Sequence, residues 1–503
     1  MEIDRRHGSG HTPTVDRNGN GRSNCHLNRS LTLFPATALV VGVVIGSGIF
    51  VSSAQMARDL KSPGLLLMVW ALTGVMTLFG AFTLCELLGQ IPSTGGLYRY
   101  LRDIYGEKTG FFYGWASFTI AGSGGIAALA FIFATYVSEF VWLPHLGPGL
   151  EKWALTIPYV GSIFPLADIG AKGVGILLIA FLTLLNIRGV KLGAFLQCVS
   201  TSAKVMAVLS IIAVAFLCSS GHSGSFSTRS NPSPVGFALI GAVIASMSSA
   251  FWAYDGWGSV SSVAGEVHEP EKTLPRAILL GTVSVIILYL LINVAYLYVL
   301  PMAGIGGAPD DRVASSFMTA AIGSKGAVLI SVLVVLSTFD ATNASILTSA
   351  RIYFAMAEDG LFAPGADQVH LRFKTPHRAL LYQGLGAGLL LLSGSFDLLA
   401  SMYIFINWIL YLLQGIGVFV LRRRNPTGLR PYQTPGYPWV PLAFVVFAAA
   451  FVILTLVNDV ADFHSGKEPI IKSLMGVLFV MTGLPFYIYW KTRSKIPNSS
   501  LRD

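Results

Sequence analysis

Long runs of apolar residues dominate the chain and are separated by short polar segments. A helix needs about 20 residues to cross roughly 30 Å of hydrocarbon, and these runs reach that length. They are unbroken and lack the alternation of apolar and polar positions that is typical of barrel strands. The pattern therefore predicts an all-α membrane protein with about twelve transmembrane helices. The predicted spans cover residues 31–57, 64–91, 111–141, 170–187, 194–218, 235–262, 275–300, 326–356, 378–395, 398–420, 438–457 and 470–490.

The polar segments predict the orientation of these spans. With twelve spans, most of the 34 lysines and arginines fall on the same side as the N-terminus. Cytoplasmic loops carry such an excess, so we expect a plasma (inner) membrane protein with both termini in the cytoplasm. Residues 1–30 are polar and lack a signal-peptide pattern, which predicts a disordered tail. Residues 491–503 form the expected cytoplasmic C-terminus.

Composition narrows the classes of function. The chain is 53% hydrophobic and only 12% charged, and its net charge of +9 follows the topology, so no nucleic-acid partner is expected. The nine histidines lie in the tail or in loops without metal-ligand spacing, and the four cysteines show no CxxC pattern. We therefore expect no enzyme activity, no cofactor and no metal site.

The first apolar run contains a weak point, Gly46-Ser47-Gly48. Each glycine costs about 1 kcal/mol in a helix interior, so the helix is expected to unwind there. Irregular backbone at this depth survives only when protein buries it or when it lines a watery cavity. Close packing of two helices over small residues is the alternative interpretation.

A second weak point favours the cavity. Asp255 and Gly256 interrupt the sixth run, which opens a second block of five spans, 235–420, after the first, 31–218. An odd number of spans inverts the second block, which predicts an inverted repeat. The ends of broken helices suit a carboxylate and an ammonium group, as in a zwitterion.

Several motifs carry a resemblance to a known family. They are "VIGSGIF", "IPSTGGLYRYLRDIYG", "FWAYDGWG", "GEVHEPEKTLPRAI" and "LSTFDATNASILTSARIYFAMAEDG". Together they resemble the amino acid-polyamine-organocation superfamily, and within it the bacterial members of the L-type amino-acid transporter family, over roughly residues 31–490. The resemblance implies a LeuT-type 5+5 inverted repeat with discontinuous helices 1 and 6 and alternating access. It implies a ten-helix transport core, 31–423, and two peripheral helices, 11 and 12, in 438–490.

The resemblance also implies a binding site. The substrate carboxylate would lie on backbone N–H groups of Ser47 and Gly48, and its ammonium on backbone carbonyls of the two broken helices. Trp252 would close over the substrate as a gate, although an aromatic residue packed in the bundle is the alternative. The candidate substrate-binding residues are Ile45, Gly46, Ser47, Gly48, Phe251, Trp252, Ala253, Asp255 and Phe405.

Lys204 lies in the middle of the fifth span, too deep for its stem to reach water easily. An ammonium there costs roughly 2.5–3.5 kcal/mol even on the mild insertion scale. The resemblance implies that it takes the place of a sodium ion, bonded to a backbone oxygen of Gly42 or Ile45 and to the hydroxyl of Ser337. Transport would then not require sodium, while proton loading by Lys204 stays open.

Asp340 departs from the family, whose members usually carry a small residue at this position. Helical spacing places it on one face with Ser337 and Ala341. It therefore either pairs with Lys204 or lines the substrate cavity and favours cationic substrates.

The expected function is Na⁺-independent transport or exchange of L-amino acids, neutral and, as an open alternative, cationic. A proton-coupled amino-acid or polyamine permease and a transporter-like sensor are the other candidates. The loop between the third and fourth spans, "VWLPHLGPGLEKWALTIPYVGSIFP", contains no cysteine. The cysteine that joins animal family members to a glycoprotein partner is missing, so no disulfide-linked heavy chain is expected.

Overall fold

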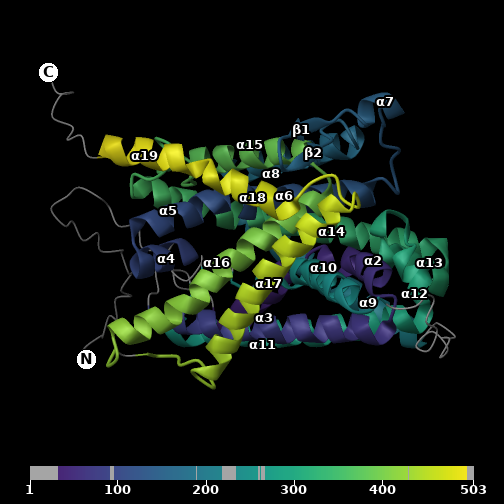
Figure 1. The fold of residues 1–503 in the computed structure, drawn as a ribbon, viewed down its shortest axis with the longest axis horizontal. Helices are drawn as coiled ribbons and strands as arrows, with labels where there is room; N and C mark the ends of the chain where they lie inside the picture. Colours follow the sequence, from purple (N-terminus) through teal and green to yellow (C-terminus); the bar gives the residue numbers. More distant parts are fainter. Residues whose placement is uncertain are drawn as a thin grey trace, which may run out of the picture.

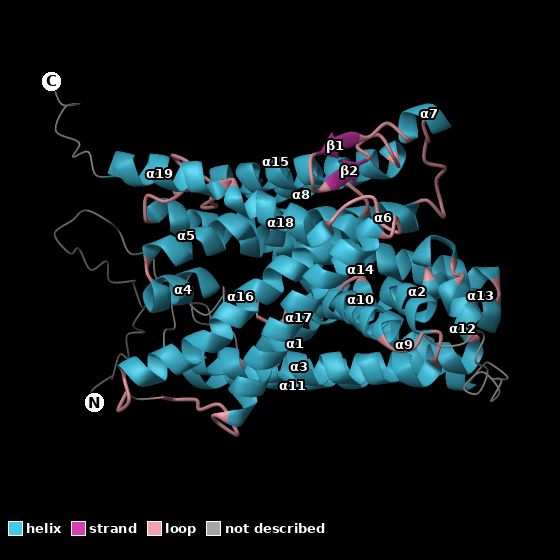
Figure 2. Cartoon of the chain, viewed as in Figure 1, coloured by secondary structure: helices cyan, strands magenta, loops and turns pink. Residues whose placement is uncertain are grey.

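A computed structural model shows a bundle of helices that mostly run along one common direction (Figures 1 and 2). It describes residues 32–90, 96–188, 190–217, 234–258, 261, 267–428 and 430–494. Each of the predicted spans corresponds to a helix or to a pair of helices, so the predicted all-α membrane fold is confirmed. The predicted disordered tail lies outside the described residues.

The helices follow the apolar runs, and end where glycine, proline or polar residues interrupt them. In chain order they are α1 Leu33–Val44, α2 Gly48–Leu60, α3 Pro63–Gln90, α4 Leu97–Tyr105, α5 Glu107–Ala116, α6 Ser123–Val137, α7 Pro148–Glu151, α8 Ile169–Arg188, α9 Val190–Leu217, α10 Phe237–Tyr254, α11 Pro270–Val299, α12 Met302–Gly306, α13 Val313–Ile322, α14 Ser324–Glu358, α15 His377–Ser393, α16 Phe396–Arg424, α17 Trp439–His464, α18 Lys472–Met481 and α19 Gly483–Ser494.

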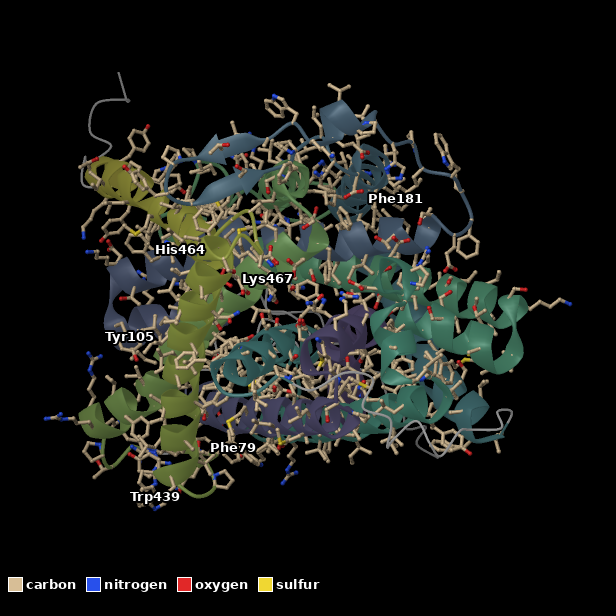
Figure 3. The ribbon with its side chains drawn as sticks, turned by 45° about the vertical axis from the view of Figure 1, so that its right-hand side comes forward. Phe79, Tyr105, Phe181, Trp439, His464 and Lys467 are labelled. Atoms are coloured by element: carbon tan, nitrogen blue, oxygen red, sulfur yellow. The ribbon has the colours of Figure 1, made fainter. Side chains whose placement is uncertain are left out.

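Length and composition support the membrane assignment. Among the described residues, 9 helical stretches are long and apolar enough to cross a membrane, or up to 10 when the bent pair α1 and α2 is taken as one span. The other two predicted spans correspond to α9 and to the 17-residue α15. Large apolar side chains face outward, as for Phe181, which is 55% exposed and is labelled in Figure 3. Such a surface requires lipid around it.

Both predicted breaks are present. Between α1 and α2 the chain bends by 41°. α10 ends at Tyr254, after which Asp255 is extended and Gly256 has a φ of +103°. The part of the sixth run beyond Gly258 lies largely outside the described residues.

Several short elements were not predicted. The third span contains a π-helical stretch, Ser117–Ala121, between α5 and α6. The loop after α6 holds an antiparallel pair of strands, β1 Leu155–Ile157 and β2 Gly161–Ile163, with Leu155 opposite Ile163. A 3₁₀ turn, Pro309–Asp311, lies between α12 and α13. These elements are too short to produce the long apolar signal on which the span prediction rests.

The arrangement places the two breaks in the middle of the bundle. In Figure 1, α3 and α11 lie along one edge, α8 and α15 lie towards the opposite edge, and α10 and α2 lie between them. α4 lies at one end of the long axis, and α12 and α13 lie at the other. One apolar cluster surrounds α1, α2, α3, α10 and α11, and a second surrounds α5, α6, α8, α15 and α16. Trp252 packs against both clusters.

Glu86 illustrates a buried charge with a structural role. Its carboxylate is fully buried in α3 and accepts hydrogen bonds from Nε and an Nη of Arg422, at 2.7 and 2.8 Å. The backbone N–H of Thr434 donates a third, at 2.8 Å. The carboxylate therefore joins α3 to α16 and to the segment that precedes α17.

We predict that Arg422→Gln lowers stability by about 3–5 kcal/mol, because it leaves a buried carboxylate without its main positive partner. The measurement is the melting temperature of the purified full-length protein in detergent. Arg423→Gln is the matched control, since it removes the same charge from the exposed neighbouring position. Equal melting temperatures for the two variants would show that the pair does not stabilise the fold.

Candidate functional site

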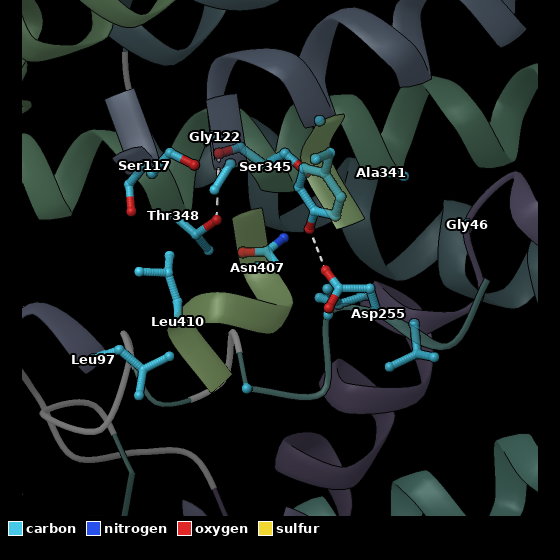
Figure 4. Close-up of a pocket in the computed structure, with 18 of the residues that line it drawn as sticks. Gly46, Leu97, Ser117, Gly122, Asp255, Ala341, Ser345, Thr348, Asn407 and Leu410 are labelled. Atoms are coloured by element: carbon cyan, nitrogen blue, oxygen red, sulfur yellow. Dashed lines mark hydrogen bonds between the residues drawn. The ribbon is translucent and has the colours of Figure 1, made fainter. Parts of the chain in front are cut away.

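A central cavity of about 180 Å³ lies where the two broken helices meet (Figure 4). The break between α1 and α2 contributes Gly46, Ser47 and Gly48 to its wall, and the end of α10 contributes Trp252 and Asp255. Most of the remaining wall comes from the third span, α14 and α16, with Tyr113, Ser117, Gly122, Gly125, Ala341, Ser345, Thr348, Asn407 and Leu410 among its residues. The cavity is therefore polar at several points although it lies deep in an apolar bundle.

The N-terminus of α2 opens into this cavity. The first N–H groups of a helix have no intrahelical acceptor, and the helix dipole makes this end positive. Among the described residues, no acceptor is bonded to the N–H of Ser47 or Gly48. Both residues line the cavity, so they present an anion-binding end to it.

Glycine is required at both breaks because the two broken helices touch there. A Cβ atom on Gly48 would lie only 2.4 Å from Cα of Ala253 in α10. Gly256 combines its positive φ with a neighbour, since an added Cβ would lie 2.9 Å from Cγ1 of Val43. The close-packing interpretation and the cavity interpretation of the glycines therefore hold together: small residues bring two helices into contact beside the cavity.

Side chains bond to the carbonyls that the breaks release. The hydroxyl of Tyr289 in α11 lies 3.0 Å from the carbonyl of Val44 and 3.1 Å from that of Ala253, so one group reaches the last residues of both α1 and α10. The hydroxyl of Ser337 in α14 donates to the carbonyl of Gly46, at 3.2 Å. Sequence analysis missed Tyr289, because a tyrosine in an apolar run gives no signal until the contacts of the fold are known.

Asp255 binds α16 through its side chain. Its carboxylate accepts hydrogen bonds from the hydroxyls of Tyr403 and Tyr411, the latter at 2.5 Å. The residue lines the cavity, as the sequence predicts, and its carboxylate is held between two tyrosines. The broken end of α10 is thereby fixed to α16.

Trp252 stands at the boundary of the central cavity. Its indole N–H donates to Oγ of Ser47, at 3.4 Å, which joins the two breaks through their side chains. Its ring packs edge to face against Phe396 and Tyr403, with centroids 5.5 and 5.2 Å apart. The residue also lines a second cavity, with which the central cavity shares no other residue.

Lys204 is fully buried in α9, and its ammonium has two partners. It donates to the carbonyl of Gly42 in α1, at 2.7 Å, and it forms an ion pair with Asp340 in α14, at 2.7 Å. Ser337, expected as the second partner, donates to Gly46 instead. The expected Lys204–Ser337 contact is therefore wrong. Ser337 and Asp340 lie one turn apart on one face of α14, and the Asp340 carboxylate is the partner that neutralises the buried ammonium of Lys204.

Asp340 therefore pairs with Lys204, which is the first of the two alternatives from the sequence. It is buried and is not among the residues that line the central cavity. The second alternative, that its carboxylate contacts cationic substrates, finds no support in this geometry.

Four of the candidate binding residues do not line the cavity: Ile45, Phe251, Ala253 and Phe405. All four are buried. The ring of Phe251 packs on Trp408 with centroids 4.2 Å apart. On α16, helical periodicity places residues 403, 407, 410 and 411 on the cavity face, and it turns Phe405 away into an apolar cluster. Spacing shows that Tyr403, Asn407 and Leu410 share a face of α16, but it does not show that this face, rather than that of Phe405, meets the cavity.

Comparison with known proteins agrees with the motifs. Residues 31–482 match the amino acid permease family. The chain is similar to the serine/threonine exchanger SteT of Bacillus subtilis, with 32% identity over 93% of this chain and 98% of the relative. It is also similar to the human large neutral amino acids transporter small subunit 2, with 28% identity over 97% of this chain and 86% of the relative. The human b(0,+)-type amino acid transporter 1 is 27% identical over 92% and 88%.

These matches span almost the whole described bundle, including both breaks and the residues around the central cavity. The relatives are transporters and exchangers rather than enzymes, which confirms the expectation that catalysis is not the function.

We predict that Gly48→Ala impairs transport. The added methyl group has to displace the backbone of α10 or α2, at a cost of about 1–3 kcal/mol for an overpacked site, which corresponds to a roughly 5- to 150-fold loss of the transport-competent arrangement. Gly124→Ala in α6 is the control, because its Cβ would meet its nearest neighbour at 3.9 Å. The measurement is amino-acid uptake into proteoliposomes at matched protein content. Equal uptake by the two variants would contradict close contact at Gly48.

Proposed function

This chain belongs to the amino acid permease family and is an amino-acid transporter, and from that premise we propose that it exchanges neutral L-amino acids across the membrane without sodium. One observation carries the proposal. The ammonium of Lys204 lies fully buried, 2.7 Å from the carbonyl of Gly42 just before the first break. A cation that belongs to the protein occupies the place where a mobile cation would otherwise bind the backbone of α1.

The proposed binding mode uses the ends of the broken helices. The substrate carboxylate lies on the N–H groups of Ser47 and Gly48, which line the cavity at the positive end of α2. Of the residues whose backbone carbonyls were expected to bind the α-ammonium, Ile45, Phe251, Trp252 and Asp255, only Trp252 and Asp255 line the cavity, and the ammonium lies on these two. The carbonyls of Gly42, Val44, Gly46 and Ala253 already accept side-chain donors and are therefore not assigned to the ammonium.

Alternating access follows from the arrangement of the bundle. The ten-helix core 31–423 consists of the repeats 31–218 and 235–420, inverted with respect to each other, and helices 11 and 12 in 438–490 are peripheral. Trp252 is the gate, since it lies between the central cavity and a second cavity. Its bond to Ser47 and its contact with Tyr403 give the closed position a physical basis.

The setting of the transporter is proposed on the same grounds. Both termini lie in the cytoplasm and the protein resides in the plasma (inner) membrane, as the distribution of lysine and arginine indicates. It works without a disulfide-linked heavy chain, because the loop between the third and fourth spans contains no cysteine.

Proton-coupled transport is the second candidate, favoured by the ion pair of Lys204 and Asp340, whose side chains are 0% and 1% exposed. Such a pair can hold or release a proton when its surroundings change. A polyamine substrate is less well supported, because a polyamine has no carboxylate for the N-terminus of α2. A sensor function would require binding without flux.

We predict that purified protein in proteoliposomes takes up labelled L-serine by counterflow when the lumen contains unlabelled amino acid. Uptake should be the same in sodium chloride and in choline chloride, because Lys204 supplies the fixed cation. Repeating the assay with and without a pH gradient separates exchange from proton coupling, and a screen of the other amino acids, including leucine and arginine, defines the range of substrates. Uptake that depends on sodium would contradict the proposal, and binding without flux would favour the sensor.

We predict that Lys204→Met and Asp340→Asn each lower stability by about 3–5 kcal/mol, because each leaves one buried charge without its partner. The double variant should regain most of that stability, since no charge is left. Its exchange activity should stay low, however, because the carbonyl of Gly42 has lost its donor. Melting temperature and counterflow are the two measurements. A double variant that is both stable and fully active would reduce the pair to a structural role.

A further inference from the structure

A second cavity, of about 160 Å³, lies beyond Trp252, and we call it the distal chamber. It is lined by α2, α10, α16 and α17 and by the segment that connects α17 to α18, where Figure 3 labels Lys467. Trp252 and Phe396 line it with edge-to-face rings. Trp252 is also the one residue that the chamber shares with the central cavity, so the two cavities are separate spaces on either side of one ring.

Carboxylates outnumber ammonium groups in the distal chamber. The acidic lining residues are Asp59, Asp311, Asp397, Asp459, Asp462 and Glu468, and the basic ones are Lys467 and Lys472. Lys472 pairs with Asp397 and with Glu468, and Lys467 pairs with Asp462. Asp311 pairs with Arg58, at 2.6 Å. These pairs account for both lysines of the lining and leave part of its negative charge uncompensated.

Two carboxylates of the chamber have only neutral hydrogen-bond partners. Asp59 accepts from the side-chain amide of Gln55, at 3.1 Å, and Asp459 accepts from the backbone N–H of Ser473, at 2.7 Å. Among the described residues, no ion pair joins either carboxylate to a lysine or an arginine. Carboxylates in such a space attract a cation, because the low-dielectric walls strengthen the field and a cation restores neutrality.

Thr455 gives an independent indication of a polar ligand. It lines the chamber and is only 9% exposed, yet its hydroxyl has no hydrogen-bond partner among the described residues. Thr73, Thr77 and Thr83 in α3 each donate to the carbonyl four residues earlier, as helical threonines commonly do. A buried hydroxyl without a partner costs free energy, which a bound polar group would recover.

We propose that the distal chamber binds the protonated amine or guanidinium group of an organic cation, at a site separate from the central cavity. The carboxylates of Asp59 and Asp459 accept its N–H groups, Thr455 supplies a hydroxyl, and the face of Trp252 or Phe396 stacks against the cation. The chemistry is opposite to that of the central cavity, where the N-terminus of α2 favours a carboxylate. The chamber therefore takes a cation that has no carboxylate at all, as well as the side chain of a cationic amino acid.

The test uses purified full-length protein and two probes, agmatine, which has a guanidinium and an amine but no carboxylate, and L-arginine. Ligand binding raises the melting temperature in a saturable way. We expect such a rise for agmatine in the wild type, with its midpoint concentration about tenfold higher in the Asp59→Asn/Asp459→Asn variant. Asp367→Asn, which removes an exposed carboxylate elsewhere, should leave the midpoint unchanged. If the double variant does not fold, Asp59→Asn alone and Thr455→Val test the site instead. Each should raise the agmatine midpoint concentration by a smaller factor than the double variant.

Further outcomes decide the assignment. If L-arginine but not agmatine raises the melting temperature, and the double variant loses this rise, the result supports the chamber as a site for cationic amino acids. Saturating L-serine should leave the agmatine midpoint unchanged if the two cavities fill independently. The proposal would be overturned if neither probe raised the melting temperature in a saturable way. It would also be overturned if L-serine raised the agmatine midpoint concentration while the double variant left it unchanged. The proposal rests on the proposed function only where it assigns the central cavity to amino acids. The melting assay measures binding and needs no transport, so absence of cation binding in the chamber and absence of exchange are distinguishable.

Discussion

A backbone that unwinds inside a membrane has to find partners for the groups that it frees, because hydrocarbon offers none. Around the first break, Lys204 donates to the carbonyl of Gly42, Tyr289 to that of Val44, and Ser337 to that of Gly46. The N–H groups of Ser47 and Gly48 face the central cavity instead. Side chains therefore bond to the freed carbonyls, whereas the freed N–H groups face the cavity. This division makes the cavity side of the break favourable for an anionic group.

The donors come from three different helices, α9, α11 and α14, so the break is also a junction of the bundle. Tyr289 reaches the ends of both α1 and α10, and Asp255 holds the end of α10 to α16 through two tyrosines. When either broken helix moves, these hydrogen bonds have to break, or the bonded side chains have to move with the helix. If substrate binds at the breaks, as proposed, its binding is physically coupled to the helices that surround them, which is the requirement of a carrier that opens to one side at a time.

The sequence predicted the features that depend on local chemistry. Apolar runs located the spans, and glycines located both breaks, because only glycine suits an unwound backbone in contact with another helix. It did not predict features that depend on contacts between distant segments. Ser337 and Asp340 share a helix face, and spacing alone could not decide which one reaches Lys204. Likewise, Asn407 rather than Phe405 faces the cavity, and the choice depends on how α16 is rotated within the bundle.

The most direct test of the account is an experimental structure of the protein with a transported amino acid bound. The account predicts that the carboxylate of the amino acid lies within hydrogen-bond distance of the backbone N–H groups of Ser47 and Gly48, with Trp252 over the substrate and Lys204 still bonded to Gly42. A substrate bound away from the breaks, or an α1 and α2 that form one continuous helix whose N–H groups are bonded within it, would contradict the account.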